Sequence, residues 1–296
     1  MKTSCTACHT TYTKSASPLT RITPTLATRM TGADLCEGCR EEVASPMKDL
    51  FTTNNPKTAK GEASGYLTHV LHLAPHRVSG YNVCPMATAG CSAACLNTAG
   101  RGGIMKPGCS TNSIQRRRII RTRQYMTRRG EFMARIVREI ENGIKRASRY
   151  DLTPVFRLNG TSDIRWELEP VRRDGVDYGN VMLAFPDITF YDYTKLANRW
   201  GLPANYTLTF SLADGNMGDV RTAMRSGMNI AVVFAPRLPR VFMGWPVIDG
   251  DVSDLRFTDP GAWCGGGVVV GLKAKGKAKH DITGFVYRVD TDVEGL

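Results

Sequence analysis

The chain has 296 residues, of which 42% are hydrophobic, enough for one large domain and a small one. Its net charge of +12 favours a polyanionic partner or an anionic substrate, although a merely basic surface would give the same value. No apolar run reaches membrane-spanning length and the N-terminus lacks the apolar core of a signal peptide, so we expect a cytoplasmic protein without a membrane partner. Nine cysteines in such a chain favour metal ligands over disulfides.

The N-terminal segment contains two C-x2-C pairs, Cys5 with Cys8 and Cys36 with Cys39, separated by 27 residues. Each pair can form a tight turn that directs two thiolates at one ion, which is typical of a zinc site of the ribbon or treble-clef kind. We therefore expect residues 1–45 to form a zinc-ribbon-like module whose metal supplies the folding energy.

Residues 46–62 are expected to be a linker, because Asn54, Asn55, Pro56 and Gly61 break regular structure. Beyond it, strands and helices alternate. The helices are expected over Asn112–Tyr150, broken near Gly130, and over Asp219–Ser226. The strands are expected at Tyr66–Ala74, Thr153–Leu158, Val181–Phe185, Ile188–Tyr191, Tyr206–Phe210, Asn229–Phe234, Val247–Ile248 and Val268–Leu272.

Continuous apolar strands that alternate with helices predict a parallel sheet. We therefore expect residues 63–296 to form an α/β domain, a partial or complete TIM-like parallel (β/α) barrel. An open doubly wound sheet is the alternative, because strand spacing alone does not distinguish a closed barrel from a sheet with free edges.

Three cysteines, Cys84, Cys91 and Cys95, lie in one short loop rich in alanine and glycine after the first of these strands. Three thiolates suit an iron–sulfur cluster with one open iron, or a zinc ion completed by a fourth ligand. Cys109 lies 14 residues further on and is a possible fourth ligand, which would close the site. The compact loop favours three ligands.

Polar side chains follow the other expected strands. In parallel α/β folds the ligand site lies at the carboxyl ends of the strands, so we expect these side chains to face one cavity. Each of them, taken singly, is as well explained by a turn or a helix cap. The candidates for cofactor binding are Arg157, Asn159, Thr161, Asp163, Asp192, Lys195, Ser211, Lys273 and Lys275.

The cysteine loop resembles, in position and ligand number, that of radical S-adenosylmethionine enzymes, where three cysteines hold a [4Fe–4S] cluster. The spacing here is C-x6-C-x3-C rather than the usual C-x3-C-x2-C of that superfamily, and Leu96 replaces the usual aromatic residue. The resemblance implies that the ribose and amino group of S-adenosylmethionine are held by Asn159, Asp163, Asp192 and Ser211. It also implies that Lys273 or Lys275 meets a carboxylate or phosphate.

Seven arginines lie within 14 residues of the long expected helix. They cover more than one helix face, so some would contact phosphates or an acidic neighbour, unless they form a solvated surface. The candidates for nucleic-acid binding are Arg116, Arg117, Arg118, Arg121 and Arg123.

Seven segments carry a family resemblance: Asn55–Thr58, Tyr66–Pro75, Ser79–Ala87, Cys91–Gly102, Arg157–Asp163, Phe190–Lys195 and Gly271–Ala278. They resemble the bacteriophage family called gene product eighty-eight, over roughly residues 54–285. The resemblance implies a phage origin and expression in the cytoplasm of a bacterial host. It implies no catalytic residues, because the family is uncharacterised.

The leading hypothesis is an iron–sulfur enzyme that uses S-adenosylmethionine on a nucleotide or nucleic acid. The alternative is a non-catalytic, zinc-dependent protein that binds nucleic acid. A third hypothesis is a metal-independent α/β enzyme that acts on a phosphorylated substrate held by Lys273, Lys275 and Lys277.

Overall fold

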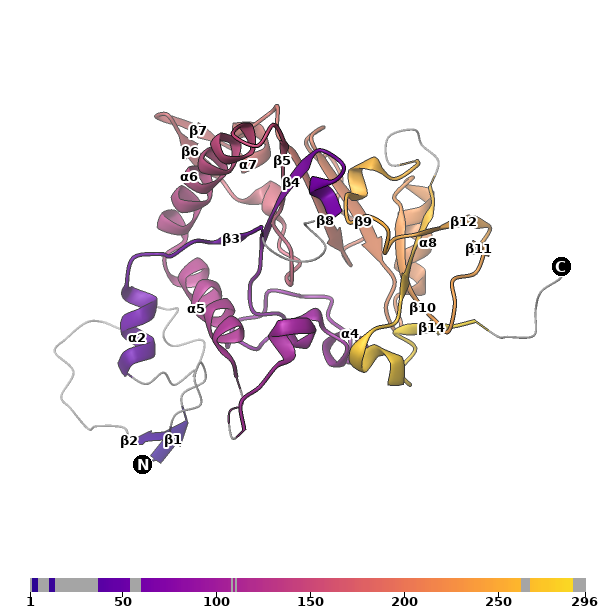
Figure 1. Ribbon diagram of the computed structural model, residues 1–296, viewed down its shortest axis with the longest axis horizontal. Helices are drawn as coiled ribbons and strands as arrows, with labels where there is room; N and C mark the ends of the chain where they lie inside the picture. The colour runs from indigo at the N-terminus through magenta and orange to yellow at the C-terminus, as the bar shows by residue number, and fades with distance from the viewer. Residues whose placement is uncertain are drawn as a thin grey trace.

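A ten-stranded sheet forms the centre of the protein, which we describe from a computed structural model (Figure 1). The structure describes residues 2–4, 11–13, 37–53, 60–107, 109, 111–261 and 267–289. The sheet consists of β3 (Phe51–Thr52), β4 (Tyr66–Leu71), β5 (Thr153–Arg157), β8 (Thr189–Thr194), β9 (Tyr206–Ser211), β10 (Ile230–Ala235), β11 (Val241–Phe242), β12 (Trp245–Asp249), β13 (Val269–Lys273) and β14 (Val286–Arg288).

The strand order is β11-β12-β13-β10-β9-β8-β5-β4-β3, with β14 also paired to β10. Every pair from β4 to β12 is parallel, whereas β3 and β11 add antiparallel strands at the two edges. The strands from β4 to β10 are neighbours in chain order, as in a barrel, but in the described chain the sheet ends at β3 and β11 and does not close. The expected complete barrel is therefore wrong, and the fold is mixed α/β with a largely parallel, open sheet.

Side chains alternate along each strand, so the sheet has two faces with different neighbours. Helices cover one of these faces. Phe156 of β5 and Leu208 of β9 pack in one cluster with Ile136 of α6 (Arg129–Ser148). On the same face, Phe210 packs with Val220 of α8 (Met217–Arg225). The connections from β4 to β5 and from β9 to β10 thus lie on the same side of the sheet, as right-handed crossovers in one direction require.

The opposite face of the sheet is also buried. Val155 and Tyr191 pack there against Leu255 and Phe257, which lie in and beside the short 3₁₀ helix η4 (Arg256–Thr258). Burial on both faces explains why these strands are read as nearly continuous apolar runs in the sequence.

Two expected elements differ from the structure. The segment expected as a strand at Val181–Phe185 forms helix α7 (Val181–Ala184), because the Asn180 side chain caps it by accepting a hydrogen bond of 2.9 Å from the Leu183 N–H. The long expected helix is two helices, α5 (Ser113–Thr127) and α6, and the break falls at Arg128 rather than Gly130. A hairpin of β6 (Val171–Arg173) and β7 (Val176–Tyr178) was not expected.

The N-terminal part forms a hairpin of β1 (Lys2–Ser4) and β2 (Thr11–Thr13) and a helix, α2 (Glu37–Ala44), which lies beside α5 (Figure 1). Arg128 Nη1 donates to the carbonyls of Val43 and Ala44, at 2.9 and 3.0 Å, and so caps the end of α2. Cys5, Cys8 and Cys36 lie outside the described residues, as does the side chain of Cys39, so the zinc module stays a prediction.

Part of the segment expected as a linker forms β3 at the sheet edge, where Phe51 pairs with Leu71. Within the described chain, the helices all lack the length and apolarity that crossing a membrane requires.

Candidate cysteine site

The cysteine loop lies over the carboxyl ends of the parallel strands, after β4. Its centre is a short helix, α4 (Ala89–Ala93), which begins at Thr88 because the Thr88 hydroxyl accepts a hydrogen bond of 3.1 Å from the Cys91 N–H. Cys84, Cys91 and Cys95 are free and half-buried, whereas Cys109 is exposed.

Hydrogen bonds fasten the start of the loop to the chain that follows β5. The Asp163 N–H donates to the Val83 carbonyl at 2.8 Å, and the Thr161 hydroxyl donates to the Leu73 carbonyl at 2.5 Å. The Cys84 thiol lies 3.7 Å from the Thr161 carbonyl. The first cysteine is thus held against residues that the sequence had singled out at the end of β5.

The middle of the loop is fastened to the chain that follows β9. The Thr88 hydroxyl donates to the Asp214 carboxylate, which also accepts a hydrogen bond of 3.2 Å from the Gly90 N–H. A Cβ at Gly90 would lie 2.7 Å from Asp214 Oδ1 and 2.8 Å from the Phe285 Cβ, and closer still to the Thr283 hydroxyl. Only glycine fits at this position.

The three thiols and two cations influence one another electrostatically. The pKa of the Cys84 thiol is raised to about 12 by burial and, to a smaller extent, by the nearby charges of Asp163, Cys95 and Cys91, against a hydrogen bond from the His76 backbone. Burial also raises the pKa of Cys95. The nearby Cys91 raises this pKa as well, whereas the charges of Lys195 and Arg118 lower it. The Cys84 and Cys95 thiols are therefore protonated at neutral pH, and a metal centre would have to displace their protons.

Cys84, Cys91 and Cys95 are the residues of the loop whose thiols could ligate a metal centre. Among the described residues, no three His, Cys, Asp or Glu side chains are arranged to hold a single metal ion. A cluster distributes its thiolates over several irons and therefore spaces them more widely than one ion does. The three thiols are half-buried and lie near one another, and the charges of Arg118 and Lys195 would offset the negative charge of a thiolate at Cys95.

Several of the predicted strand-end residues do meet near the loop. Asp163 accepts hydrogen bonds of 2.8 Å from both the Thr194 hydroxyl and the Lys195 N–H, which joins the ends of β5 and β8. Burial raises the pKa of Asp163 despite these bonds and despite the nearby Arg199. Thr161 and Asp163 thus lie near Cys84, and Lys195 acts on Cys95.

Asn159 and Asp192 hold the fold rather than face a cavity. Asp192 is fully buried and accepts hydrogen bonds from the Asn159 N–H at 2.7 Å and from the Tyr206 hydroxyl at 3.0 Å. The Asn159 side chain accepts hydrogen bonds from the Ile164 N–H and the Trp166 indole, at 2.9 and 3.0 Å. Both residues shape the turn that presents Thr161 and Asp163.

The remaining candidates lie elsewhere or are paired. Arg157 faces the other side of the sheet, where it forms an ion pair of 3.0 Å with Asp254. Two lysines at the end of β13 and just beyond it are paired with acidic residues around the end of β12, namely Lys273 with Asp249 at 3.0 Å and Lys275 with Asp251 at 2.7 Å. Ser211 ends β9, and its carbonyl accepts a hydrogen bond of 3.0 Å from Asn216 Nδ2.

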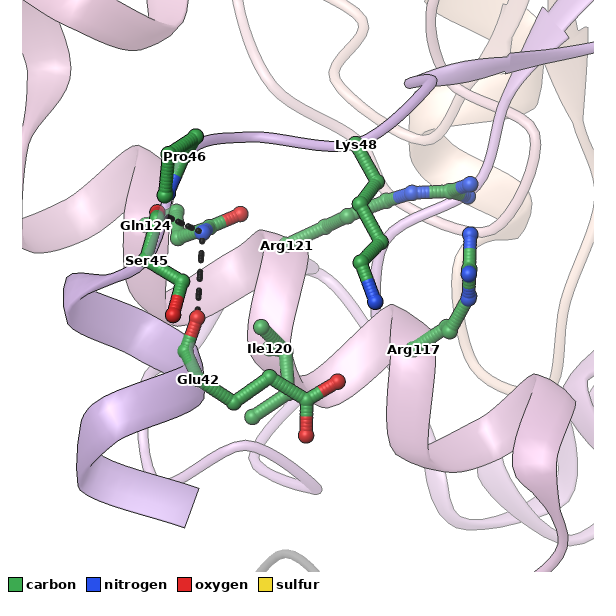
Figure 2. A pocket seen from close by; sticks show the side chains of 8 residues that line it. All are labelled: Glu42, Ser45, Pro46, Lys48, Arg117, Ile120, Arg121 and Gln124. Atoms are coloured by element: carbon green, nitrogen blue, oxygen red, sulfur yellow. Dashed lines mark hydrogen bonds between the residues drawn. The ribbon is translucent and has the colours of Figure 1, made fainter. Parts of the chain in front are cut away.

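The arginines of α5 divide by helix face. Arg123 is only 5% exposed, Arg116 forms an ion pair of 2.8 Å with Glu42, and Arg118 binds Asn97 beside the cysteine loop. Arg117 and Arg121 line a hollow between α5 and the segment after α2 (Figure 2). Lys48, which also lines it, was missed because it lies in the segment expected as a linker.

The fold and site define a mixed α/β protein with an open, largely parallel sheet and a cysteine loop at the carboxyl ends of its strands. The family model for Gene product 88 matches residues 49–289, so the chain belongs to the Gene product 88 family. The match includes the loop cysteines and excludes the N-terminal cysteine pairs. It gives no support to the resemblance to radical S-adenosylmethionine enzymes. No curated protein and no solved structure matches the chain.

Proposed function

We propose that this protein is an iron–sulfur enzyme in which Cys84, Cys91 and Cys95 hold a [4Fe–4S] cluster. The observation that supports the proposal is the position of three half-buried, mutually interacting thiols at the carboxyl ends of parallel strands. Ligand sites of parallel α/β proteins lie at this edge. The exposure of Cys109 favours three cysteine ligands over four.

The surrounding residues would have defined tasks in such a site. The bonds from Thr88 and Gly90 to Asp214 would hold the loop in place, and the Thr161 carbonyl would orient the Cys84 side chain. Arg118 and Lys195 favour the ionised form of Cys95 and would compensate the negative charge of thiolate ligands. The partial burial of the thiols would limit access of water and oxygen.

An open iron with bound S-adenosylmethionine would supply reductive cleavage of that cofactor and so begin radical chemistry on a substrate. The substrate class in this proposal is a nucleotide or nucleic acid, which the net charge of +12 and the arginines of α5 support. Action in the cytoplasm of a bacterial host and a zinc ion on the N-terminal cysteine pairs are further parts of the proposal.

The test uses protein purified without oxygen and reconstituted with iron and sulfide. We expect a brown protein that cleaves S-adenosylmethionine when a strong reductant is present. Serine at any one of the three loop cysteines should abolish both properties, whereas Cys109→Ser is the matched control and should retain them. Cluster assembly without cofactor cleavage would contradict the enzymatic part of the proposal.

A second function is favoured by the basic hollow beside α5, which requires no cluster. In that case the protein is a non-catalytic, zinc-dependent protein that binds nucleic acid, and the loop cysteines hold zinc. Colourless protein that contains zinc and binds an oligonucleotide, with no cleavage of S-adenosylmethionine, would support it over the enzyme.

A further inference from the structure

A hollow of about 130 Å³ lies between α5 and the segment that leads from α2 to β3 (Figure 2). Figure 2 shows that the side chains of Lys48, Arg117 and Arg121 bring their nitrogen atoms to the same side of the hollow. Lys48 and Arg117 are exposed and Arg121 is half-buried. Three cationic groups from two separate segments therefore converge on one accessible site.

Within the described chain, the three cations of the hollow form no ion pair. Glu42 contributes the carboxylate among the lining residues, and this carboxylate forms an ion pair of 2.8 Å with Arg116. Arg121 donates a hydrogen bond of 2.6 Å to the Asp49 carbonyl, which carries no charge. Neither Lys48 nor Arg117 forms an ion pair with any described residue.

The cations also act on one another. Burial and, to a smaller extent, the neighbouring charge of Arg117 lower the pKa of Arg121 to about 10, against the opposite effects of Glu139 and Asp49. Like charges brought together at this cost favour an anion between them. Two guanidinium groups beside an ammonium group match the oxygens of a phosphate, which accept paired N–H donors.

We infer that this hollow binds a backbone phosphate of a nucleic-acid strand, an inference that rests on the substrate class of the proposed function. An extended polyanion suits the site better than an enclosed small ligand does, because two of its three cations are exposed. Lys48 directly precedes the region that the Gene product 88 family model matches, residues 49–289, and both arginines lie within it.

The hollow and the cysteine loop share helix α5. Arg118 follows Arg117 but lies on another face of the helix, where its Nη1 donates to Asn97 Oδ1 at 2.9 Å, and its charge acts on Cys95. A nucleic-acid strand bound at the hollow would therefore contact the same helix that borders the loop cysteines.

The test is a fluorescence-anisotropy titration of a labelled single-stranded DNA oligonucleotide at several salt concentrations. The variants are Lys48→Gln, Arg117→Gln and the double variant, and the matched control is Arg221→Gln, an exposed arginine on α8. Each hollow variant should reduce the slope of log affinity against log salt by about 1, and the double variant by about 2. At low salt the double variant should bind roughly tenfold more weakly. Circular dichroism should show that all variants remain folded.

Equal losses in the control and in the hollow variants, or binding by the double variant as tight as that of the unaltered protein, would overturn the inference. Inorganic phosphate serves as a competitor. Oligonucleotide binding no tighter than phosphate binding would assign the hollow to free phosphate and likewise overturn it.

The titration is carried out with and without reconstituted iron and sulfide, so the two proposals fail separately. If the protein assembles no cluster but the double variant loses oligonucleotide binding, the inference about the hollow stands and the proposed iron–sulfur enzyme is contradicted. If the cluster assembles but the double variant binds the oligonucleotide as the unaltered protein does, the iron–sulfur proposal stands and the inference about the hollow is contradicted.

Discussion

Arg118 Nη1 donates to Asn97 Oδ1 at 2.9 Å, and this bond joins α5 to the turn that directly follows Cys95. The same nitrogen lies 3.3 Å from the Asn97 carbonyl, and Asn97 itself is buried. The relationship links the basic helix to the cysteine loop. It also distinguishes Arg118, which holds structure, from its neighbour Arg117, which is exposed.

Arg118→Ala should therefore destabilise the protein by roughly 1–3 kcal/mol, because it removes charge-assisted hydrogen bonds and leaves a buried amide without its partner. Urea unfolding measures this change. Arg117→Ala is the matched control and should alter the free energy of unfolding by less than about 0.5 kcal/mol. Equal stabilities of the two variants would contradict the role given to the Arg118–Asn97 bond.

Gly90→Ala should destabilise the protein by roughly 1–3 kcal/mol, because the new Cβ would collide with Asp214, Phe285 and Thr283. It should also disturb α4, which carries Cys91. The control is Gly130→Ala in α6, where no atom lies within 4 Å of an added Cβ and the change should be neutral or slightly stabilising. A Gly90 variant as stable as the unaltered protein would show that α4 does not pack as described.

Asp192 should make stability depend on pH. Burial raises its pKa from 3.8 to about 7, although Arg157 and the Asn159 N–H lower it. A raised pKa means that the folded protein binds the proton more tightly than the unfolded chain does. The stability that results is fully present below pH 3.8 and is lost as the pH rises to about 7.

Asp192→Asn removes this titration. The unaltered protein should therefore lose roughly 2–4 kcal/mol of unfolding free energy relative to the variant between about pH 4 and about pH 8. Urea unfolding at a series of pH values measures the difference. A constant difference across that range would show that Asp192 does not titrate in the folded protein.

The predicted N-terminal metal site should hold α2 in place, because Cys36 directly precedes this helix in the sequence. We expect zinc removal by a chelator to increase hydrogen exchange in Glu37–Ala44, where Arg128 caps the last carbonyls. The control is Cys109→Ser, which should leave this exchange unchanged. Absence of zinc from purified protein would contradict the predicted module.

Much of the sheet could be predicted from the sequence, because its strands are buried on both faces and stand out as apolar runs. The open edges could not, since they are set by β3 and β11, which are only two residues long. The strand expected at Val181–Phe185 is a helix because of a cap from Asn180, which outweighs the β-branched and aromatic residues that favoured a strand.

For the site, the loop cysteines and their meeting with Thr161 and Asp163 followed from the rule on strand ends. The pairing of Lys273 with Asp249 did not, because it depends on β12, which follows β11 along the chain but lies beside β13. The sequence likewise did not predict which arginines of α5 line the hollow, because this depends on how α5 is rotated against α2.

The measurement that tests the central claim most directly is a count of iron, sulfide and zinc per chain in protein reconstituted without oxygen. The proposal predicts about four iron and four sulfide per chain, lost in each serine variant of Cys84, Cys91 and Cys95 and retained in Cys109→Ser. Zinc in place of iron at these three cysteines, with no sulfide, would contradict it.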